Sequence, residues 1–194
     1  MGVEQQKIIA DEIYAKLQVI DPYCILAGGA PRDWYFGNPA NDLDFYFYSN
    51  GSTIRAVRKQ LQAQFGTVQL LMDRERCTTN PLYKTMEDLV RIWEMEYQGQ
   101  KVQMIQLGNP RSTFKVVDKM DVSVCQVWYI GGEVRLSENF KLTLASNIMF
   151  PTAEGYSWSD PHAQKMITRF KGKFHAGTKE SAQDVVIRKA LQTI

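Results

Sequence analysis

The sequence is poor in the residues on which disulfide-bonded, zinc-binding and histidine-dependent proteins rely. Its 194 residues include only three cysteines, Cys24, Cys77 and Cys125, which lie far apart and form no CxxC pair. This odd, scattered set disfavours both a disulfide framework and a zinc site of the usual spacing. The only histidines are His162 and His175, so a histidine-based triad or a multi-histidine metal site is nearly excluded.

The sequence also lacks long apolar runs. None approaches the ~20 residues needed to cross a bilayer, and the first ten residues lack the basic and apolar blocks of a secretory signal. We therefore expect a cytoplasmic protein with no membrane partner. Hydrophobic residues make up 44% of the chain and charged residues 23%, which is enough to bury a core and excludes a disordered tail.

The net charge of +2 is too small to indicate a nucleic-acid-binding protein, but the charges are unevenly distributed. Residues 1–50 contain three basic and seven acidic side chains, giving −4. Between Pro161 and Lys179 there are five basic residues and no acidic one, giving +5. An acidic first part and a basic last part favour a metal site that faces a polyanion.

Hydrophobic periodicity and turn residues predict a mixed sheet with helices around it, in a chain of about one domain. Helices are expected over residues 3–18, from Pro31, over 52–65 and 110–117, and over most of the chain from Glu138. Strands are expected over residues 23–27, 43–47, 67–71, 89–97 and 101–107, through Val122, Val124, Val127 and Tyr129, and over 133–136. Residues 73–88 are expected to form a long loop. The fold class is therefore α+β, close to α/β, with residues 1–137 as a catalytic core and 138–194 as a helical extension packed on it.

The first informative motif is Gly28-Gly29, which follows a predicted strand and precedes a predicted helix. A diglycine at such a junction lets backbone N–H groups approach a phosphate without interference from a Cβ atom. Arg32 lies one turn further on, where it could orient a phosphate or pair with an aspartate. Asp33, next to it, could cap or lock the helix.

The second motif is Asp42-Leu43-Asp44. Residues two apart on a strand point to the same face, so the two carboxylates lie together and repel each other unless a cation bridges them. One or two Mg²⁺ or Mn²⁺ ions would satisfy these oxygen ligands and could clamp a phosphoryl displacement.

Together the two motifs read GGxxRD, a spacer and DxD, which closely resembles the head-domain signature of nucleotidyltransferases related to DNA polymerase β. The similarity is greatest to the CCA-adding enzymes and poly(A) polymerases. The resemblance implies a polymerase β-like nucleotidyltransferase fold and transfer of a nucleoside monophosphate from an NTP, with ATP or CTP favoured. The acceptor it implies is an RNA 3′ end, particularly that of tRNA, and pyrophosphate is released.

The resemblance also assigns roles to residues of this sequence. Asp42 and Asp44 are the implied catalytic metal ligands, and nucleotide binding falls to Gly28, Gly29, Arg32 and Asp33. A third catalytic metal-binding carboxylate is implied on a later strand, where Asp121 fits and Asp118 is the alternative.

The basic stretch near the end of the chain suggests polyanion binding. Lys165 and Arg169 are four residues apart on one face of a predicted helix, and we assign them to the nucleotide triphosphate. Lys171 and Lys173 follow, and we assign them to an RNA backbone.

Three other functions remain open on the sequence. The acceptor could be a protein or a small molecule, because the implied fold serves all three kinds of acceptor. The chain could instead be a non-catalytic nucleotide- or RNA-binding module, although two adjacent carboxylates argue against it. A nucleotide-sugar glycosyltransferase would also use an Asp-x-Asp motif, but the diglycine and the short chain speak against it.

Overall fold

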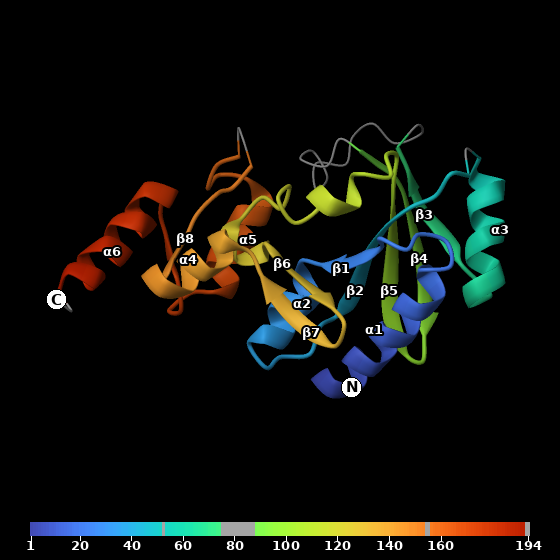
Figure 1. Ribbon diagram of the computed structural model, residues 1–194, viewed down its shortest axis with the longest axis horizontal. Helices are drawn as coiled ribbons and strands as arrows, with labels where there is room; N and C mark the ends of the chain where they lie inside the picture. The colour runs from blue at the N-terminus through green and yellow to red at the C-terminus, as the bar shows by residue number, and fades with distance from the viewer. Residues whose placement is uncertain (52, 75–87, 154–155, 193–194) are drawn as a thin grey trace. The chain divides into compact units, whose positions relative to one another are not determined.

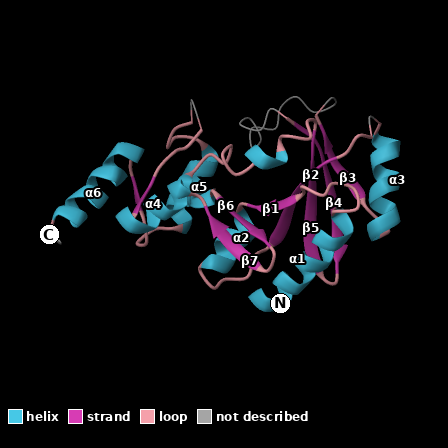
Figure 2. Ribbon diagram, in the orientation of Figure 1, coloured by secondary structure: helices cyan, strands magenta, loops and turns pink. Residues whose placement is uncertain are grey.

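The computed structural model describes residues 1–51, 53–74, 88–153 and 156–192 (Figure 1). The α-helices are α1 (Val3–Leu17), α2 (Gly29–Tyr35), α3 (Ile54–Phe65), α4 (Glu138–Ser146), α5 (Pro161–Arg169) and α6 (Lys179–Leu191), and the 3₁₀ turns are η2 (Thr113–Lys115) and η3 (Ser123–Cys125). The strands are β1 (Ile25–Ala27), β2 (Asp42–Tyr48), β3 (Gln69–Asp73), β4 (Leu89–Tyr97), β5 (Gln100–Leu107), β6 (Val127–Ile130), β7 (Glu133–Leu136), β8 (Ile148–Met149) and β9 (His175–Ala176). Helices and strands are both abundant (Figure 2), which confirms the predicted α+β class.

Seven strands form one mixed sheet in the order β3-β4-β5-β2-β1-β6-β7. The central pair, β2 and β5, is parallel, whereas β1–β2, β1–β6, β3–β4 and β4–β5 are antiparallel. The predicted hairpin over β4 and β5 is confirmed, with Gln98 and Gly99 at positive φ in its turn. Most of the loop expected over residues 73–88 lies outside the described residues.

The contacts divide the chain into two compact units, one of residues 1–116 and 128–135 and one of residues 117–127 and 136–194. Residues 117–127 thus group with the C-terminal helices and not with the sheet that precedes them in the sequence. None of the described helices is both long enough and apolar enough to cross a membrane.

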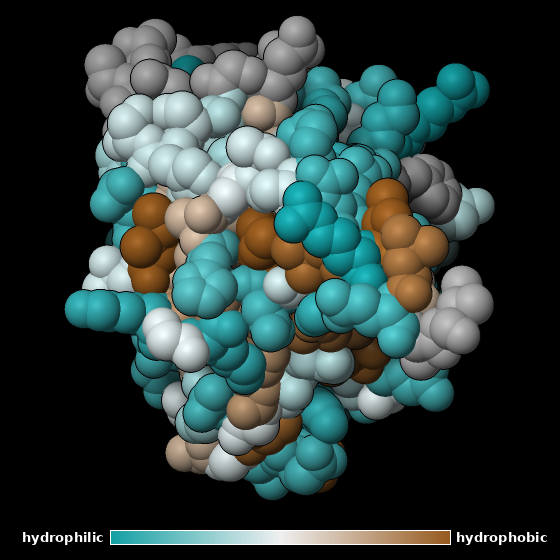
Figure 3. Space-filling model, turned by 90° about the vertical axis from the view of Figure 1, so that its left-hand side faces the viewer, coloured by the Kyte–Doolittle hydropathy of each residue, from teal (hydrophilic) through white to brown (hydrophobic). Residues whose placement is uncertain are grey.

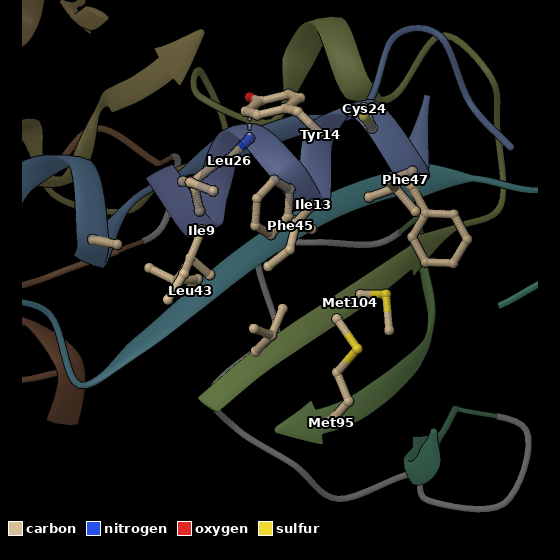
Figure 4. Close-up of a cluster of buried hydrophobic side chains, with 14 of the residues drawn as sticks. Ile9, Ile13, Tyr14, Cys24, Leu26, Leu43, Phe45, Phe47, Met95 and Met104 are labelled. Atoms are coloured by element: carbon tan, nitrogen blue, oxygen red, sulfur yellow. Dashed lines mark hydrogen bonds between the residues drawn. The ribbon is translucent and has the colours of Figure 1, made fainter. Parts of the chain in front are cut away.

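The core of the N-terminal unit lies between α1 and one face of the sheet (Figure 4). On β2, Leu43, Phe45 and Phe47 are fully buried, because alternate residues of a strand share a face. Helix α1 presents Ile9 and Ile13 to them at helical spacing, and both are also fully buried. The polar residues of β2 are thereby directed to the opposite face.

Tyr14 fixes the position of β1 beneath α1. Its hydroxyl donates to the backbone oxygen of Tyr129 at 2.5 Å and accepts from the backbone N–H of Leu26 at 2.6 Å, the bond drawn in Figure 4. Burial raises the pKa of this phenol well above its ordinary value, so the hydroxyl stays protonated. Strand β1 is therefore held at the point where it leads into Gly28.

The C-terminal unit contains α4, α5, α6, η3 and a small parallel sheet of β8 and β9. Phe140 of α4, Phe150 and Ala163 of α5 are completely buried and form part of its core. The three helices agree with the prediction of a mainly helical chain from Glu138, but β8 and β9 were not predicted. These strands are only two residues long, too short for a period-2 pattern to show in the sequence.

Two predicted elements are wrong. The strand through Val122 and Val124 begins only at Val127, because residues 123–125 form the turn η3 and Val122 makes an isolated bridge to Pro151. All of residues 122–125 are buried, so their apolar pattern carries no periodicity. The helix expected over residues 110–117 is reduced to η2, since the side chain of Asn109 accepts from the Arg111 N–H and forms a competing local turn.

Candidate active site

The two aspartates of the sequence motif lie on the sheet face opposite the core. Asp42 and Asp44 alternate along β2 with the fully buried Leu43 and Phe45, so both carboxylates point to the same side. Both residues are half-buried, and the Oδ1 atom of Asp44 is buried. The predicted juxtaposition of two carboxylates therefore exists in the fold.

The neighbouring strands extend this pair into a polar row. In the parallel strand β5, Lys101 is the partner of Asp42 and Gln103 the partner of Asp44. One strand further, Glu94 of β4 is the partner of Gln103. The Nζ atom of Lys101 lies 2.8 Å from Oε2 of Glu94, and Nε2 of Gln103 donates to the same oxygen at 3.3 Å.

The charges in this row influence one another. The hydrogen bond and charge of Glu94, followed by the charges of Asp42 and Asp44, raise the pKa of Lys101 above its ordinary value. The hydrogen bond from Lys101 is the main cause that lowers the pKa of Glu94. The lysine therefore stays cationic beside the aspartates. The aspartate oxygens are the hard donors that Mg²⁺ prefers, so the residues present fit such an ion.

The diglycine turn connects β1 to α2. Gly28 has φ 86° and ψ −116°, a conformation that side chains other than glycine rarely adopt. A Cβ atom on Gly29 would lie 3.8 Å from the guanidinium of Arg32, which is ordinary contact distance. The fold itself therefore explains the glycine at position 28, whereas it does not require one at position 29. The assignment of both to phosphate binding stays a prediction.

Arg32 and Asp33 are both buried, with 4% and 6% of their surface exposed. The Nε and terminal guanidinium nitrogens of Arg32 lie 3.1 and 3.0 Å from Oδ1 of Asp33. The backbone oxygen of Asp33 also accepts from the N–H of Asn38, just past the end of α2. The ion pair thus joins two neighbouring residues of the helix that follows the diglycine, and its assignment to nucleotide binding stays a prediction.

Asp121 lies two residues before η3 in the C-terminal unit. Its Oδ2 atom is 2.6 Å from Nδ1 of His162, and the hydroxyl of Tyr156 also donates to it. Burial opposes ionisation of Asp121, but these hydrogen bonds and the attraction of His162 outweigh it and hold the pKa of the carboxyl below its ordinary value. The other candidate, Asp118, is exposed, and its backbone oxygen accepts from the Gln126 amide at 3.2 Å.

His162 and Cys125 were not among the predicted site residues, yet they join Asp121 in one cluster. One ligand atom from each lies within 4.8 Å of the others. Asp121 and Cys125 are close in the sequence, but Cys125 belongs to the 3₁₀ turn η3 and Val122 is extended, so no regular spacing links the two ligands. His162 is remote in the sequence, so no local pattern could reveal it.

The four predicted basic residues of the C-terminal unit are all exposed. Lys165 and Arg169 lie one turn apart on α5, whose buried side carries Ala163 and Met166. Lys171 and Lys173 flank Gly172, which has φ 82° in the turn after α5. Figure 3 shows a face of the molecule that is mainly hydrophilic, interrupted by separate hydrophobic patches.

No protein-family model and no curated protein sequence matches this chain. Several solved structures share its fold. The Thermotoga maritima CCA-adding enzyme complexed with tRNA matches with a TM-score of 0.58 and 12% identity, over 100% of this chain and 47% of that one. A tRNA nucleotidyltransferase complexed with a primer tRNA and an incoming ATP analogue matches with a TM-score of 0.52 and 17% identity, over 88% of this chain and 48% of that one.

A third match, a CCA-adding enzyme with ATP, has a TM-score of 0.51 and 12% identity over 88% of this chain and 40% of that one. This chain thus spans about half the length, or less, of the solved chains it matches. At these identities the likeness concerns the fold. The structure therefore confirms the resemblance to the head domain of CCA-adding enzymes and tRNA nucleotidyltransferases, the polymerase β-like nucleotidyltransferase fold.

Proposed function

We propose that this chain is a metal-dependent nucleotidyltransferase that transfers a nucleoside monophosphate from an NTP to the 3′ hydroxyl of an RNA and releases pyrophosphate. The observation that carries the proposal is the placement of Asp42 and Asp44 on one open face of β2, in a fold shared with tRNA nucleotidyltransferases. The solved relatives include complexes with tRNA, ATP and CTP, which supports an RNA acceptor and an ATP or CTP donor.

Asp42 and Asp44 would hold Mg²⁺ or Mn²⁺ through their carboxylate oxygens. When bound, such an ion neutralises charge on the triphosphate and stabilises the negative charge that develops during phosphoryl transfer. The contribution of the chain is to hold the two carboxylates side by side. Strand β2 supplies the spacing, and the exposed ammonium of Lys101 offsets part of their mutual repulsion.

The diglycine turn would face the triphosphate of the NTP. Gly28 gives the backbone the sharp turn between β1 and α2, and Arg32 and Asp33 form a buried ion pair within that helix. This role for Gly28 and Gly29 needs only backbone approach, which the lack of a Cβ atom allows. We do not assign Asp121 to this ion, because the donors beside its carboxylate are a sulfur and an imidazole, which do not suit Mg²⁺. Its role as a third catalytic carboxylate, with Asp118 as the alternative, stays a prediction.

The proposal is tested by incubating the full chain with Mg²⁺, total RNA and one α-³²P-labelled NTP at a time. We expect label at RNA 3′ ends, most strongly with ATP or CTP, and no label with an Asp42→Asn, Asp44→Asn double variant. Label on a protein or a small molecule instead of RNA would show that the acceptor belongs to that class and is not RNA. If the chain binds NTP and RNA but transfers no label under any of these conditions, it is a binding module and the proposal is wrong.

A further inference from the structure

The C-terminal unit brings together three side chains with different metal-binding atoms. Asp121 offers a carboxylate oxygen, Cys125 a sulfur and His162 a ring nitrogen, and these atoms lie within 4.8 Å of one another. Cys125 is buried, while the side chains of His162 and Asp121 are 29% and 13% exposed. The cysteine is therefore the most buried of the three ligands, and the histidine is the most exposed.

The backbone holds each of the three residues in place. The Asp121 backbone oxygen accepts from the Thr152 N–H at 2.9 Å, and Cys125 donates its own N–H to the Val122 backbone oxygen at 2.8 Å. His162 is the second residue of α5, directly after Pro161. Proline at the first helical position fixes the entry into a helix. The cluster is thus built on a turn and a helix start, not on a loop tip.

A hydrogen-bonded network around Ser123 makes this turn rigid. The Ser123 hydroxyl lies 2.6 Å from that of Thr143 and accepts from the Phe150 N–H at 3.1 Å, and all three residues are fully buried. The Ser123 N–H in turn donates to the Phe150 backbone oxygen at 2.9 Å. Ser123, which lies between Asp121 and Cys125 in the sequence, is therefore held by hydrogen bonds of both its side chain and its backbone.

The set of donor atoms selects a class of metal ion. Mg²⁺ and Ca²⁺ take oxygen ligands, so a thiol and an imidazole beside a carboxylate do not suit them. Zinc accepts all three donor types, and three protein ligands with one open position are its usual arrangement where it binds a further molecule. The cluster also differs in kind from the oxygen-only pair of Asp42 and Asp44.

The spacing is compatible with zinc. Bond lengths of about 2.0–2.3 Å place the ligand atoms of a tetrahedral site roughly 3.3–3.6 Å apart. Oδ2 of Asp121 and Nδ1 of His162 lie 2.6 Å apart, and the ligand atoms of all three residues lie within 4.8 Å of one another, so small side-chain movements would bring them to these distances. Binding requires the Cys125 thiol to release its proton to water and the ring nitrogen of His162 that binds the ion to be unprotonated.

Tyr156 supplies an orienting contact. Its hydroxyl donates to Asp121, and burial followed by this hydrogen bond raises the pKa of the phenol well above its ordinary value. Metal-binding carboxylates are commonly held by such a hydrogen bond, which fixes their direction. We propose that Asp121, Cys125 and His162 form a site for a single divalent transition-metal ion, with Zn²⁺ as the best match and one position open to solvent.

The proposal is tested on the full chain by titration with Zn²⁺ and, for its spectrum, with Co²⁺. We expect one equivalent to bind and the cobalt form to show a thiolate-to-metal charge-transfer band in the near ultraviolet. Cys125→Ala should remove the band, and His162→Ala should weaken binding by about 100-fold or more, since each removes one of three ligands. Tyr156→Phe should weaken it by roughly 10-fold, because it keeps all ligands and removes the orienting bond.

The chain offers matched controls. Cys24→Ala also removes a buried thiol, His175→Ala removes the other histidine, and Cys77→Ala covers the cysteine outside the described residues. All three should keep the band and the affinity. The Asp42→Asn, Asp44→Asn variant should keep them as well, which separates this site from the proposed transferase.

Two results would overturn the proposal. One is the absence of stoichiometric Zn²⁺ and Co²⁺ binding to the wild-type chain, which leaves Asp121 and His162 as a hydrogen-bonded pair only. The other is a cobalt band of equal strength in Cys125→Ala and wild type. Both measurements are independent of NTP and RNA. Should His162→Ala fail to fold, as judged by its circular dichroism, the comparison of Cys125→Ala with Cys24→Ala still decides the question.

Discussion

Asp44 on β2 and Gln103 on β5 are partners in adjacent parallel strands, so a carboxylate and an amide lie side by side on the same face of the sheet. The amide nitrogen of Gln103 is directed to Glu94, to which it donates at 3.3 Å. The strand next to the two aspartates thus contributes an amide and, at Lys101, an ammonium group, but no acid. The remaining carboxylate of this polar row, Glu94, is paired with Lys101, so a cation beside Asp44 depends mainly on Asp42 and Asp44 for its compensating charge.

This arrangement predicts the effect of adding a third carboxylate. Gln103→Glu keeps the shape of the side chain and places a carboxylate beside Asp44, so Mn²⁺ or Mg²⁺ affinity should rise by about tenfold. Isothermal titration measures it. Gln62→Glu adds the same charge on an exposed position of α3 and should leave the affinity unchanged. Equal affinities in both variants would mean that the ion does not bind at this face.

Removing either aspartate charge should abolish transfer without unfolding the protein. Asp42→Asn and Asp44→Asn each remove one ligand charge at nearly constant volume, and we expect a loss of ~10³-fold or more in transfer rate. Mg²⁺ with NTP should raise the Tm of the wild type and raise that of the variants less, because ligand binding stabilises the folded state. Activity within tenfold of wild type in both variants would contradict the proposed role.

Cys24 provides a prediction on pH. Its burial, together with the charge of Asp21, raises the pKa of the thiol to about 12. A raised pKa in the folded state means that the stabilising contribution is complete below the unfolded pKa of about 8.5 and is lost as the pH rises towards 12. The free energy of unfolding should therefore fall with pH above about 8.5, by up to ~1.4 kcal/mol per pH unit.

Urea unfolding at pH 8, 9 and 10 measures this effect. The Cys24→Ala variant is the reference, because it lacks the titrating thiol and shares every other titrating group with the wild type. The difference in free energy of unfolding between the two proteins should shrink as the pH rises. A difference that stays constant from pH 8 to pH 10 would show that the thiol does not gain its raised pKa from the fold.

The sheet and its carboxylates could be predicted because their signals are local. Leu43, Phe45 and Phe47 alternate with polar residues, and in a strand alternate residues point to opposite faces of the sheet. The turn at Gly28 between β1 and α2 also has a local signal, because its φ of 86° favours glycine whatever surrounds it. Such features are fixed by neighbours within a few residues along the chain.

The cluster around Asp121 could not be predicted because it depends on the tertiary fold. Asp121 and His162 are separated by 41 positions in the sequence, and nothing near either residue indicates the other. The turn that carries Cys125 was mistaken for a strand, because its complete burial hides the periodicity on which the prediction relied. The three cysteines and two histidines also gave no recognisable spacing, since the ligands come from different types of residue.

The last prediction concerns the exposed basic residues of the C-terminal unit, which decide how the acceptor is held. If Lys171 and Lys173 contact an RNA backbone, replacing both by Ala should weaken RNA binding and reduce its log–log salt slope by up to about two units. NTP affinity without RNA should hardly change in that variant, whereas Lys165→Ala with Arg169→Ala should lower it.

Replacing Arg55 and Lys59 of α3 by Ala removes the same charge elsewhere and should leave the salt slope as it is. Fluorescence anisotropy over a series of salt concentrations measures the slopes. Should the first variant retain both its RNA affinity and its slope, the two lysines lie on a solvated surface, and a protein or small-molecule acceptor then explains the site better than RNA does.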